Sequence, residues 1–219
     1  MLAKTTLLAA LALPLSAAPV FTHTVFTHTV FAQTAFAQTP PVAPPRIRGT
    51  IEAVDGHTLT LKARTGETMT VRLADDAKVV GVAAAKMSDI KPGLFIGTAS
   101  IPGPGDTQQA TEVTLFPASM NGTGEGSYAW DLGPTSTMTN GTVGDITQAN
   151  GRAMTVKYNG KERQIIVPDD VPVVLLNPAA DVSLVKPGAA VVVVPTRAED
   201  GTLTASRITV GENGTVPPM

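Results

Sequence analysis

Hydrophobic and polar residues alternate along the first part of the chain, over residues 47–53, 59–63 and 69–73. A period of two is typical of a β-strand with one buried face and one face in solvent. Asp55-Gly56 and Thr65-Gly66 separate the three runs, and such pairs favour tight turns. The pattern therefore predicts three consecutive antiparallel strands.

The same order of residues returns in the second half of the chain. Residues 48–51 (RGTI) match residues 140–143 (NGTV), and Asn159-Gly160 stands at a turn position of the later copy. The element Ser-x-x-Lys-Pro-Gly begins at Ser88 and again at Ser183, 95 residues later. The repeated order indicates a tandem duplication.

Each copy continues with a short stretch of helical character before its fourth strand, at residues 82–89 and 177–184. Pro178 suits the first position of the later helix. Three strands, a short helix and two strands is the order of an OB-type barrel. We therefore expect an all-β protein of two tandem OB-like five-stranded β-barrels, at residues 46–118 and 140–212, each with a short helix between strands 3 and 4. A generic small β-barrel or a half-open sandwich is the alternative.

The turn and strand residues of the two copies share a wider pattern, with G-x-I/V, L/M-T-L/V-K, D-D, K-P-G and a closing A-x-x-I/V-T in order. In this pattern the chain resembles a family of exported bacterial domains of unknown function that occur singly or in tandem in periplasmic and surface proteins. The resemblance covers residues 47–116 and 140–211. It implies an OB-like fold and export, and it implies no catalytic residue.

The amino-terminal residues are similar to a secretory signal peptide. Lys4 precedes residues 5–18 (TTLLAALALPLSAA), an uncharged Leu/Ala-rich run that is too short to span a bilayer as a helix. Four copies of a pentapeptide follow over residues 20–39. We expect residues 1–37 to be a signal peptide with this repeat, so the mature protein is periplasmic or secreted and has no integral membrane segment.

Signal peptidase requires small residues before the cleaved bond, and three positions meet this requirement. Ala37 has the most suitable preceding residues, with Ala32 and Ala17 as alternatives. Residues 38–45 then form a Pro-rich linker ahead of the first barrel.

Composition narrows the classes of function. The chain has 219 residues, 43% of them hydrophobic, with no cysteine, 4% aromatic residues and a net charge of −2. This balance argues against a basic groove for nucleic acid and excludes thiolate metal ligands. His23 and His28 lie in the pentapeptide repeat, where an odd spacing puts them on opposite faces of an extended chain. We expect no metal and no cofactor.

The segment between the two copies, residues 119–139, contains the chain's one tryptophan among glycines. We expect Tyr128 and Trp130 either to pack as a staple between the barrels or to line a ligand groove. In the groove, Glu125 and Asp131 would supply polar contacts to the ligand.

No nucleophile motif accompanies these residues, so we expect no catalytic residue and no enzyme activity. The sequence predicts an exported, non-enzymatic binding or scaffolding protein of the cell envelope, whose partner is an envelope protein or a small ligand. The alternative is a periplasmic enzyme or a small-molecule or metal-binding protein with its site in the linker. Residues 213–219 form a tail, and the oligomeric state stays open.

Overall fold

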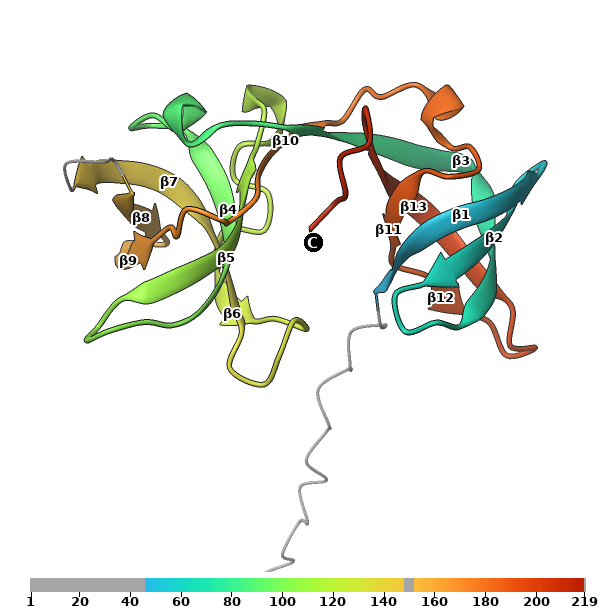
Figure 1. Cartoon of the computed structure of the whole chain (residues 1–219), viewed down its shortest axis with the longest axis horizontal. Helices are drawn as coiled ribbons and strands as arrows, with labels where there is room; N and C mark the ends of the chain where they lie inside the picture. The colour runs from blue at the N-terminus through green and yellow to red at the C-terminus, as the bar shows by residue number, and fades with distance from the viewer. Residues whose placement is uncertain (1–45, 148–151, 219) are drawn as a thin grey trace, which may run out of the picture. The chain divides into compact units, whose positions relative to one another are not determined.

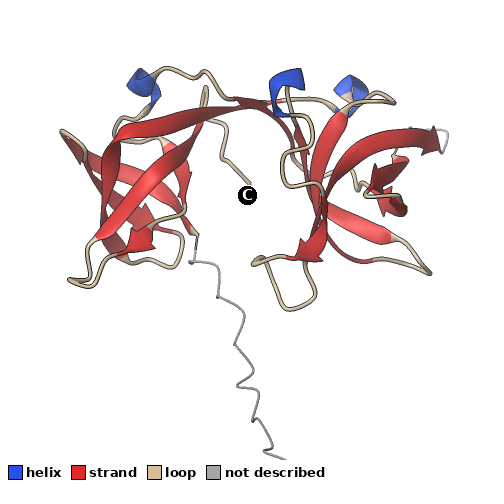
Figure 2. Cartoon of the chain, turned by 180° about the vertical axis from the view of Figure 1, so that it is seen from behind, coloured by secondary structure: helices blue, strands red, loops and turns tan. Residues whose placement is uncertain are grey.

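The computed structural model describes residues 46–147 and 152–218. These residues form thirteen β-strands and three single turns of 3-10 helix, and they contain no α-helix (Figure 2). The predicted all-β class is confirmed. The predicted signal peptide and the predicted Pro-rich linker lie outside the described residues.

The strands are β1 (Ile47–Asp55), β2 (Thr58–Ala63), β3 (Thr68–Ala84), β4 (Phe95–Pro102), β5 (Gln108–Leu115), β6 (Gly126–Ala129), β7 (Thr137–Thr147), β8 (Ala153–Tyr158), β9 (Lys161–Ile166), β10 (Val173–Asn177), β11 (Ala190–Val193), β12 (Thr196–Arg197) and β13 (Leu203–Gly211). The 3-10 turns are η1 (Met87–Asp89), η2 (Ala118–Met120) and η3 (Val182–Leu184).

Two antiparallel ladders follow the predicted hairpins. β1 pairs with β2 and β2 with β3, and in the same way β7 pairs with β8 and β8 with β9. The inward-facing Leu59 and Leu61 are fully buried, whereas Lys62, the next residue of β2, is exposed. The alternation of the sequence therefore predicted these strands and their buried faces.

Five strands close into a ring, here called the first ring: β1 pairs with β2, β2 with β3, β3 with β13, β13 with β11, and β11 with β1. A second ring closes in the same order through β7, β8, β9, β5 and β4. Figure 1 shows each group of strands lying together. Each ring takes three strands from one segment of the chain and two from the other.

This pairing differs from the two contiguous barrels expected at residues 46–118 and 140–212. The difference begins at β3, which runs as one strand from Thr68 to Ala84 and pairs along most of its length with β13. Because the chain makes no turn there, it leaves the first ring before β4 starts. β4 and β5 therefore complete the second ring, and β11 and β13 complete the first.

β10 joins the two rings into one sheet. It pairs antiparallel with the end of β3 and parallel with β5, and the sheet as a whole contains all thirteen strands (Figure 1). β6, which lies in the predicted linker 119–139, adds to β7 outside the second ring. The linker is therefore partly a strand of the sheet.

The two Lys-Pro-Gly elements make corresponding hydrogen bonds. Gly93 donates its N–H to the carbonyl of Val143 in β7, and Gly188 donates to the carbonyl of Ile51 in β1, each at 2.8 Å. Both glycines have φ +85°, a left-handed conformation that glycine adopts without strain. Each element thus fastens the end of a 3-10 turn to the first strand of the other segment.

The predicted short helices are corrected by the structure. Residues 82–84 of the first stretch belong to β3, and only η1 follows; Asn177 ends β10, and only η3 follows. A 3-10 turn of three residues satisfies few backbone groups internally, so the sheet supplies the remaining hydrogen bonds. The Pro178 signal marks the turn that leaves β10 and not a helix.

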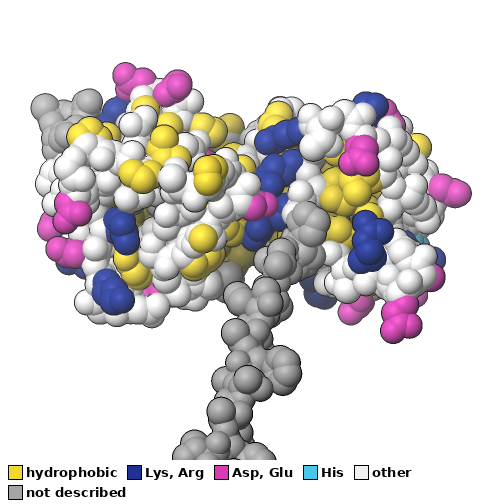
Figure 3. Space-filling model, turned by 90° about the horizontal axis from the view of Figure 1, so that it is seen from below, with side chains coloured by type: hydrophobic (Ala, Val, Ile, Leu, Met, Phe, Trp, Pro, Cys, Tyr) yellow, Lys and Arg dark blue, Asp and Glu magenta, His cyan; other side chains and the backbone are white. Residues whose placement is uncertain are grey.

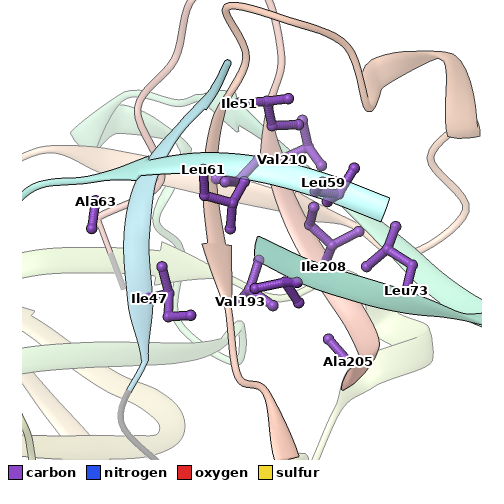
Figure 4. Close-up of a cluster of buried hydrophobic side chains, with 12 residues drawn as sticks. Ile47, Ile51, Leu59, Leu61, Ala63, Leu73, Val193, Ala205, Ile208 and Val210 are labelled. Atoms are coloured by element: carbon purple, nitrogen blue, oxygen red, sulfur yellow. The ribbon is translucent and has the colours of Figure 1, made fainter. Parts of the chain in front are cut away.

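The hydrophobic cores also draw on both segments. Inside the first ring, Ile47, Leu61 and other residues of β1–β3 pack against Val193 and Ile208 of β11 and β13 (Figure 4). A corresponding cluster inside the second ring includes Ile96 and Val156. Fully burying one such side chain stabilises a protein by about 1.5–3 kcal/mol. The stability of each ring therefore depends on strands from both segments.

Candidate functional site

The predicted linker carries Trp130 and Asp131 at the end of β6. A short loop follows them and is closed by two hydrogen bonds: Trp130 donates its N–H to the Ser136 carbonyl at 2.8 Å, and the Ser136 hydroxyl donates to the Trp130 carbonyl at 2.6 Å. Pairing of β6 with β7 fixes the other side of the loop. Trp130 and Asp131 are thus held on the sheet.

Asp131 forms ion pairs with two arginines from the start of the first ring. Arg48 Nη2 lies 2.8 Å from Oδ1 and Arg48 Nη1 lies 3.0 Å from Oδ2, a bidentate arrangement. Arg46 Nη1 is 3.5 Å from Oδ2. The hydrogen bonds from Arg48 hold the pKa of the Asp131 carboxyl below its usual range, against the partial burial that would raise it. Asp131 is therefore a fixed anion.

Arg46 also lies over the aromatic face of Trp130, with the guanidinium carbon 3.8 Å from the ring centroid. The ring of Tyr128 is tilted against that of Trp130, with 6.1 Å between centroids. Asn140 of β7 donates a hydrogen bond from Nδ2 to the Tyr128 hydroxyl at 3.3 Å. A cation–π contact and an aromatic contact together anchor Trp130.

Three of the four predicted site residues thus come together, namely Tyr128, Trp130 and Asp131. Glu125 does not join them. Its Oε1 accepts the backbone N–H of Asn159 at 2.8 Å, and its own carbonyl accepts from Asn159 Nδ2 at 3.3 Å. Glu125, which precedes β6, therefore binds the turn between β8 and β9 and does not contact the cluster around Trp130.

Glu112 of β5 was not predicted. Its side chain is buried, with 1% of its surface exposed; Oε1 accepts a hydrogen bond from Thr114, and no described residue bonds to Oε2. Burial raises the pKa of this carboxyl to about 7, although Thr114 and the charge of Arg48 lower it in part. Glu112 alternates with the apolar Val113 and Leu115, the pattern of a solvent-facing strand residue, so no sequence signal marked it.

Beside the cluster, a pocket of about 330 Å³ opens at the end of the first ring where β1 begins and β2 turns into β3. Three arginines line it, Arg46, Arg48 and Arg64, together with apolar side chains that include Met69. Glu67 also lines the pocket. Figure 3 shows a face of the molecule on which basic side chains gather in a row beside an acidic one.

Arg64 is held by the carboxyl-terminal tail. Its Nη2 donates to the carbonyl of Pro217 at 3.1 Å, and Pro217 is buried. Arg48 has its Nη atoms on Asp131, while its Nε is buried and bonds to no described residue. The pocket therefore combines arginine side chains held by other parts of the fold with an apolar floor.

A larger pocket of about 620 Å³ lies between the strands β2 and β3 and the turn that follows β12. Threonines and charges of both signs line it, among them Arg72, Arg197 and Asp200. Its walls do not favour one charge, and it is separate from the residues around Trp130. The smaller pocket is the better candidate for a selective site.

Two other kinds of feature are absent from residues 46–147 and 152–218. No group of three or more His, Cys, Asp or Glu side chains gathers there as metal ligands do, and no helix there has the length and hydrophobicity needed to cross a membrane.

Comparisons of the chain with protein-family models, with curated proteins and with solved structures gave no match.

Proposed function

We propose that the chain is an exported, non-enzymatic binding protein of the cell envelope, and that its two rings are OB-like barrels completed by exchange of strands. The five-strand closure of each ring supports the barrel assignment, and so does the order of three strands, a helical turn and two strands. The apolar run at residues 5–18 supports export.

One observation carries the binding function: three arginines and an apolar floor share a single pocket of about 330 Å³. Ligand pockets in proteins have volumes from about 300 Å³ upward, with mostly apolar walls and a few placed polar groups. Trp130 and Asp131 hold Arg46 and Arg48 in place, so the residues of the predicted linker serve the pocket by orienting its cations.

Binding is favoured over catalysis by the state of the carboxyl groups. Asp131 is paired with two arginines and Glu125 accepts a backbone N–H, so neither is free to accept a proton from a substrate. Glu112 has a suitable pKa of about 7, but only 1% of its surface is exposed, which denies a substrate contact with it.

A ligand and metal screen on the mature protein tests the proposal. Thermal unfolding would be followed by circular dichroism with a panel of small anions, neutral compounds, cations and divalent metals, for the wild type and for Trp130→Ala. We expect at least one compound to raise the midpoint, and less so in Trp130→Ala, because Arg46 then loses its support. A panel with no effect on the wild type would refute the proposed function.

Export is tested separately. The full chain would be expressed in a bacterium, the cell fractions would be separated, and the first residue of the recovered protein would be determined by mass spectrometry. Recovery outside the cytoplasm with cleavage after Ala17, Ala32 or Ala37 is the expected result, and an uncut cytoplasmic chain would contradict it.

A further inference from the structure

Neither half of the chain closes a ring with its own strands. The halves are here called the first segment, residues 46–117, and the second segment, residues 125–218. β1 of the first segment closes its ring through β11 of the second, and β7 of the second closes its ring through β4 of the first. Further ladders join β3 with β13 and β10, and β5 with β9 and β10. The segments therefore associate as the two subunits of a strand-exchanged dimer do.

A single loop, residues 118–124, connects the two segments. In the described part of the chain, all the ladders between the segments lie outside this loop. The loop itself contributes Met120, which packs against the cluster of Phe95 and Phe116, and the Thr123 carbonyl, which accepts a hydrogen bond from Asn140 at 3.2 Å. If the loop opened, the first segment of one chain could form the same ladders with the second segment of another chain.

The closed form of this loop depends on glycine. The loop leads from β5 to β6, and β4 and β7 lie between these two strands in the sheet. Gly122 and Gly124 turn the chain with φ +80° and +59°, a left-handed conformation that suits glycine and strains other residues. An open, extended loop has no such requirement. The glycines therefore stabilise the closed loop and not the ladders between the segments.

We infer that a second copy of this chain is a binding partner, and that two copies form a dimer by exchanging their second segments. In this dimer the first segment of each copy completes both rings with the partner's second segment. The pocket of about 330 Å³ is then supported by both chains, because Arg48 of one copy pairs with the partner's Asp131 and Arg64 donates to the partner's Pro217. The inference goes beyond the proposed binding function and does not depend on it.

The protein concentration during folding decides between the closed monomer and the exchanged dimer, since both contain the same ladders. A short flexible connection gives its two ends an effective concentration on the order of 1 mM. Folding at about 1 mM protein should therefore yield a large share of dimer, whereas folding at about 1 μM should yield monomer. Size-exclusion chromatography with light scattering measures the two forms of the mature protein after refolding from urea.

Single cysteines on separate chains identify the exchanged strands. Thr50→Cys and Ala190→Cys proteins would be mixed in urea, refolded together at about 1 mM and oxidised. We expect a disulfide between the two kinds of chain, because Thr50 faces Ala190 across the segments. Thr50→Cys mixed with Lys62→Cys is the control, since Lys62 faces Thr50 from the same segment and stays with its own chain. Mass spectrometry without reduction identifies the cross-linked products.

A change in the loop tests its role as the hinge. Gly122→Val strains the closed loop through its positive φ alone, because an added Cβ meets nothing within 4 Å. It should raise the ratio of dimer to monomer about tenfold or more at a fixed refolding concentration. Gly105→Val is the control, since Gly105 has φ +61° and equal space in the hairpin of β4 and β5, which is the same in both forms. Its ratio should stay unchanged.

Three results would overturn the inference. They are a mature protein that stays monomeric after refolding at about 1 mM, cross-linking between positions 50 and 190 no greater than between positions 50 and 62, and an equal rise of dimer in Gly105→Val and Gly122→Val. If Gly122→Val does not fold, the cysteine pairs alone decide. A monomer that binds a compound of the thermal screen leaves the proposed function standing, and a dimer that binds none leaves the exchange standing.

Discussion

Arg48 and Asp131 join the first strand of the first ring to the end of β6 by a bidentate ion pair with N–O distances of 2.8 and 3.0 Å. The Arg48 side chain is the more buried partner, with 12% of its surface exposed against 35% for Asp131. Removal of the carboxylate therefore leaves a largely buried guanidinium without its counter-ion, which costs more than the loss of a surface pair.

Asp131→Asn should lower the free energy of unfolding by about 1–2 kcal/mol, less than a fully buried charged hydrogen bond because the carboxylate is partly exposed. Asp75→Asn is the control, since Asp75 pairs with Arg72 on the surface and should contribute under about 1 kcal/mol. Urea denaturation at pH 7 measures both. Equal effects of the two substitutions would contradict the special role of Asp131.

The same ion pair predicts a pH dependence at low pH. The pKa of Asp131 is lower in the folded protein than in the unfolded chain, so its contribution is complete above the ordinary aspartate pKa. That contribution is lost as the pH falls through the folded value. The stability difference between wild type and Asp131→Asn should therefore shrink in strongly acidic solution, as urea denaturation over a pH series would show.

Glu112 should have the opposite dependence. Its folded pKa of about 7 lies above the ordinary value of 4.5, so the folded state holds the proton more tightly and loses stability as the pH rises from 4.5 to 7. The loss has an upper limit of roughly 3 kcal/mol at 1.36 kcal/mol per pKa unit. Glu112→Gln should remove this dependence and be more stable than wild type at pH 8.

Urea denaturation at pH 5 and pH 8 measures this effect, with Glu199→Gln at an exposed site as the control. A wild-type stability that rises between these two values of pH, with Glu112→Gln following it in parallel, would show that the carboxyl is ionised without cost.

Trp130→Ala should lower the free energy of unfolding by about 1–2 kcal/mol, through loss of the contact with Arg46 and of half-buried aromatic surface. Trp130→Phe should cost less, because no described residue accepts a hydrogen bond from the indole Nε1 and a benzene ring keeps the stacking surface. Circular dichroism is the suitable probe, since both variants lack the chain's only tryptophan. A larger loss of unfolding free energy in Trp130→Phe than in Trp130→Ala would contradict this account.

The exchange of strands is testable with engineered cysteines, because the chain has none of its own. Thr50 faces Ala190 across β1 and β11, so Thr50→Cys with Ala190→Cys should form a disulfide on oxidation. Phe95 precedes Ala190 by 95 positions, the offset between the two copies, so it is the residue that would face Thr50 in a contiguous barrel. Thr50→Cys with Phe95→Cys should therefore stay reduced. Mass spectrometry after thiol labelling shows whether each cysteine pair is oxidised or reduced. A disulfide between positions 50 and 95, with positions 50 and 190 left reduced, would mean that residues 46–118 form a ring by themselves.

Local structure was largely predictable from sequence, whereas the partners of the strands were not. The alternation around Leu59 and Leu61 and the turn at Asp55-Gly56 predict the strands β1, β2 and β3, because burial of alternate residues and backbone conformation depend on nearby sequence. β4 and β11 are both apolar strands that follow a Lys-Pro-Gly element, so either suits the edge of β1. The length of β3 decides between them, and the sequence did not predict that length, since residues 82–89 were expected to have helical character.

The site was predictable in part for the same reason. Trp130 was conspicuous as a large aromatic residue in a glycine-rich segment, and it does anchor a cluster. Arg48 looked like an ordinary outward residue of a strand, because the ion pair with Asp131 joins positions 83 residues apart. Glu112 was not marked because it alternates with Val113 and Leu115, and alternation cannot tell a face in solvent from a face covered by other parts of the fold.

The shared construction of the rings has a consequence for the order of events during synthesis. Ile47 lies opposite Val193, so the first strand made by the ribosome has no partner on one edge until almost the whole chain has emerged. Pairings so distant in sequence form slowly. The hairpins of β1 to β3 can form early, but the first ring stays open until β11 and β13 exist, so its core is completed only near the end of synthesis.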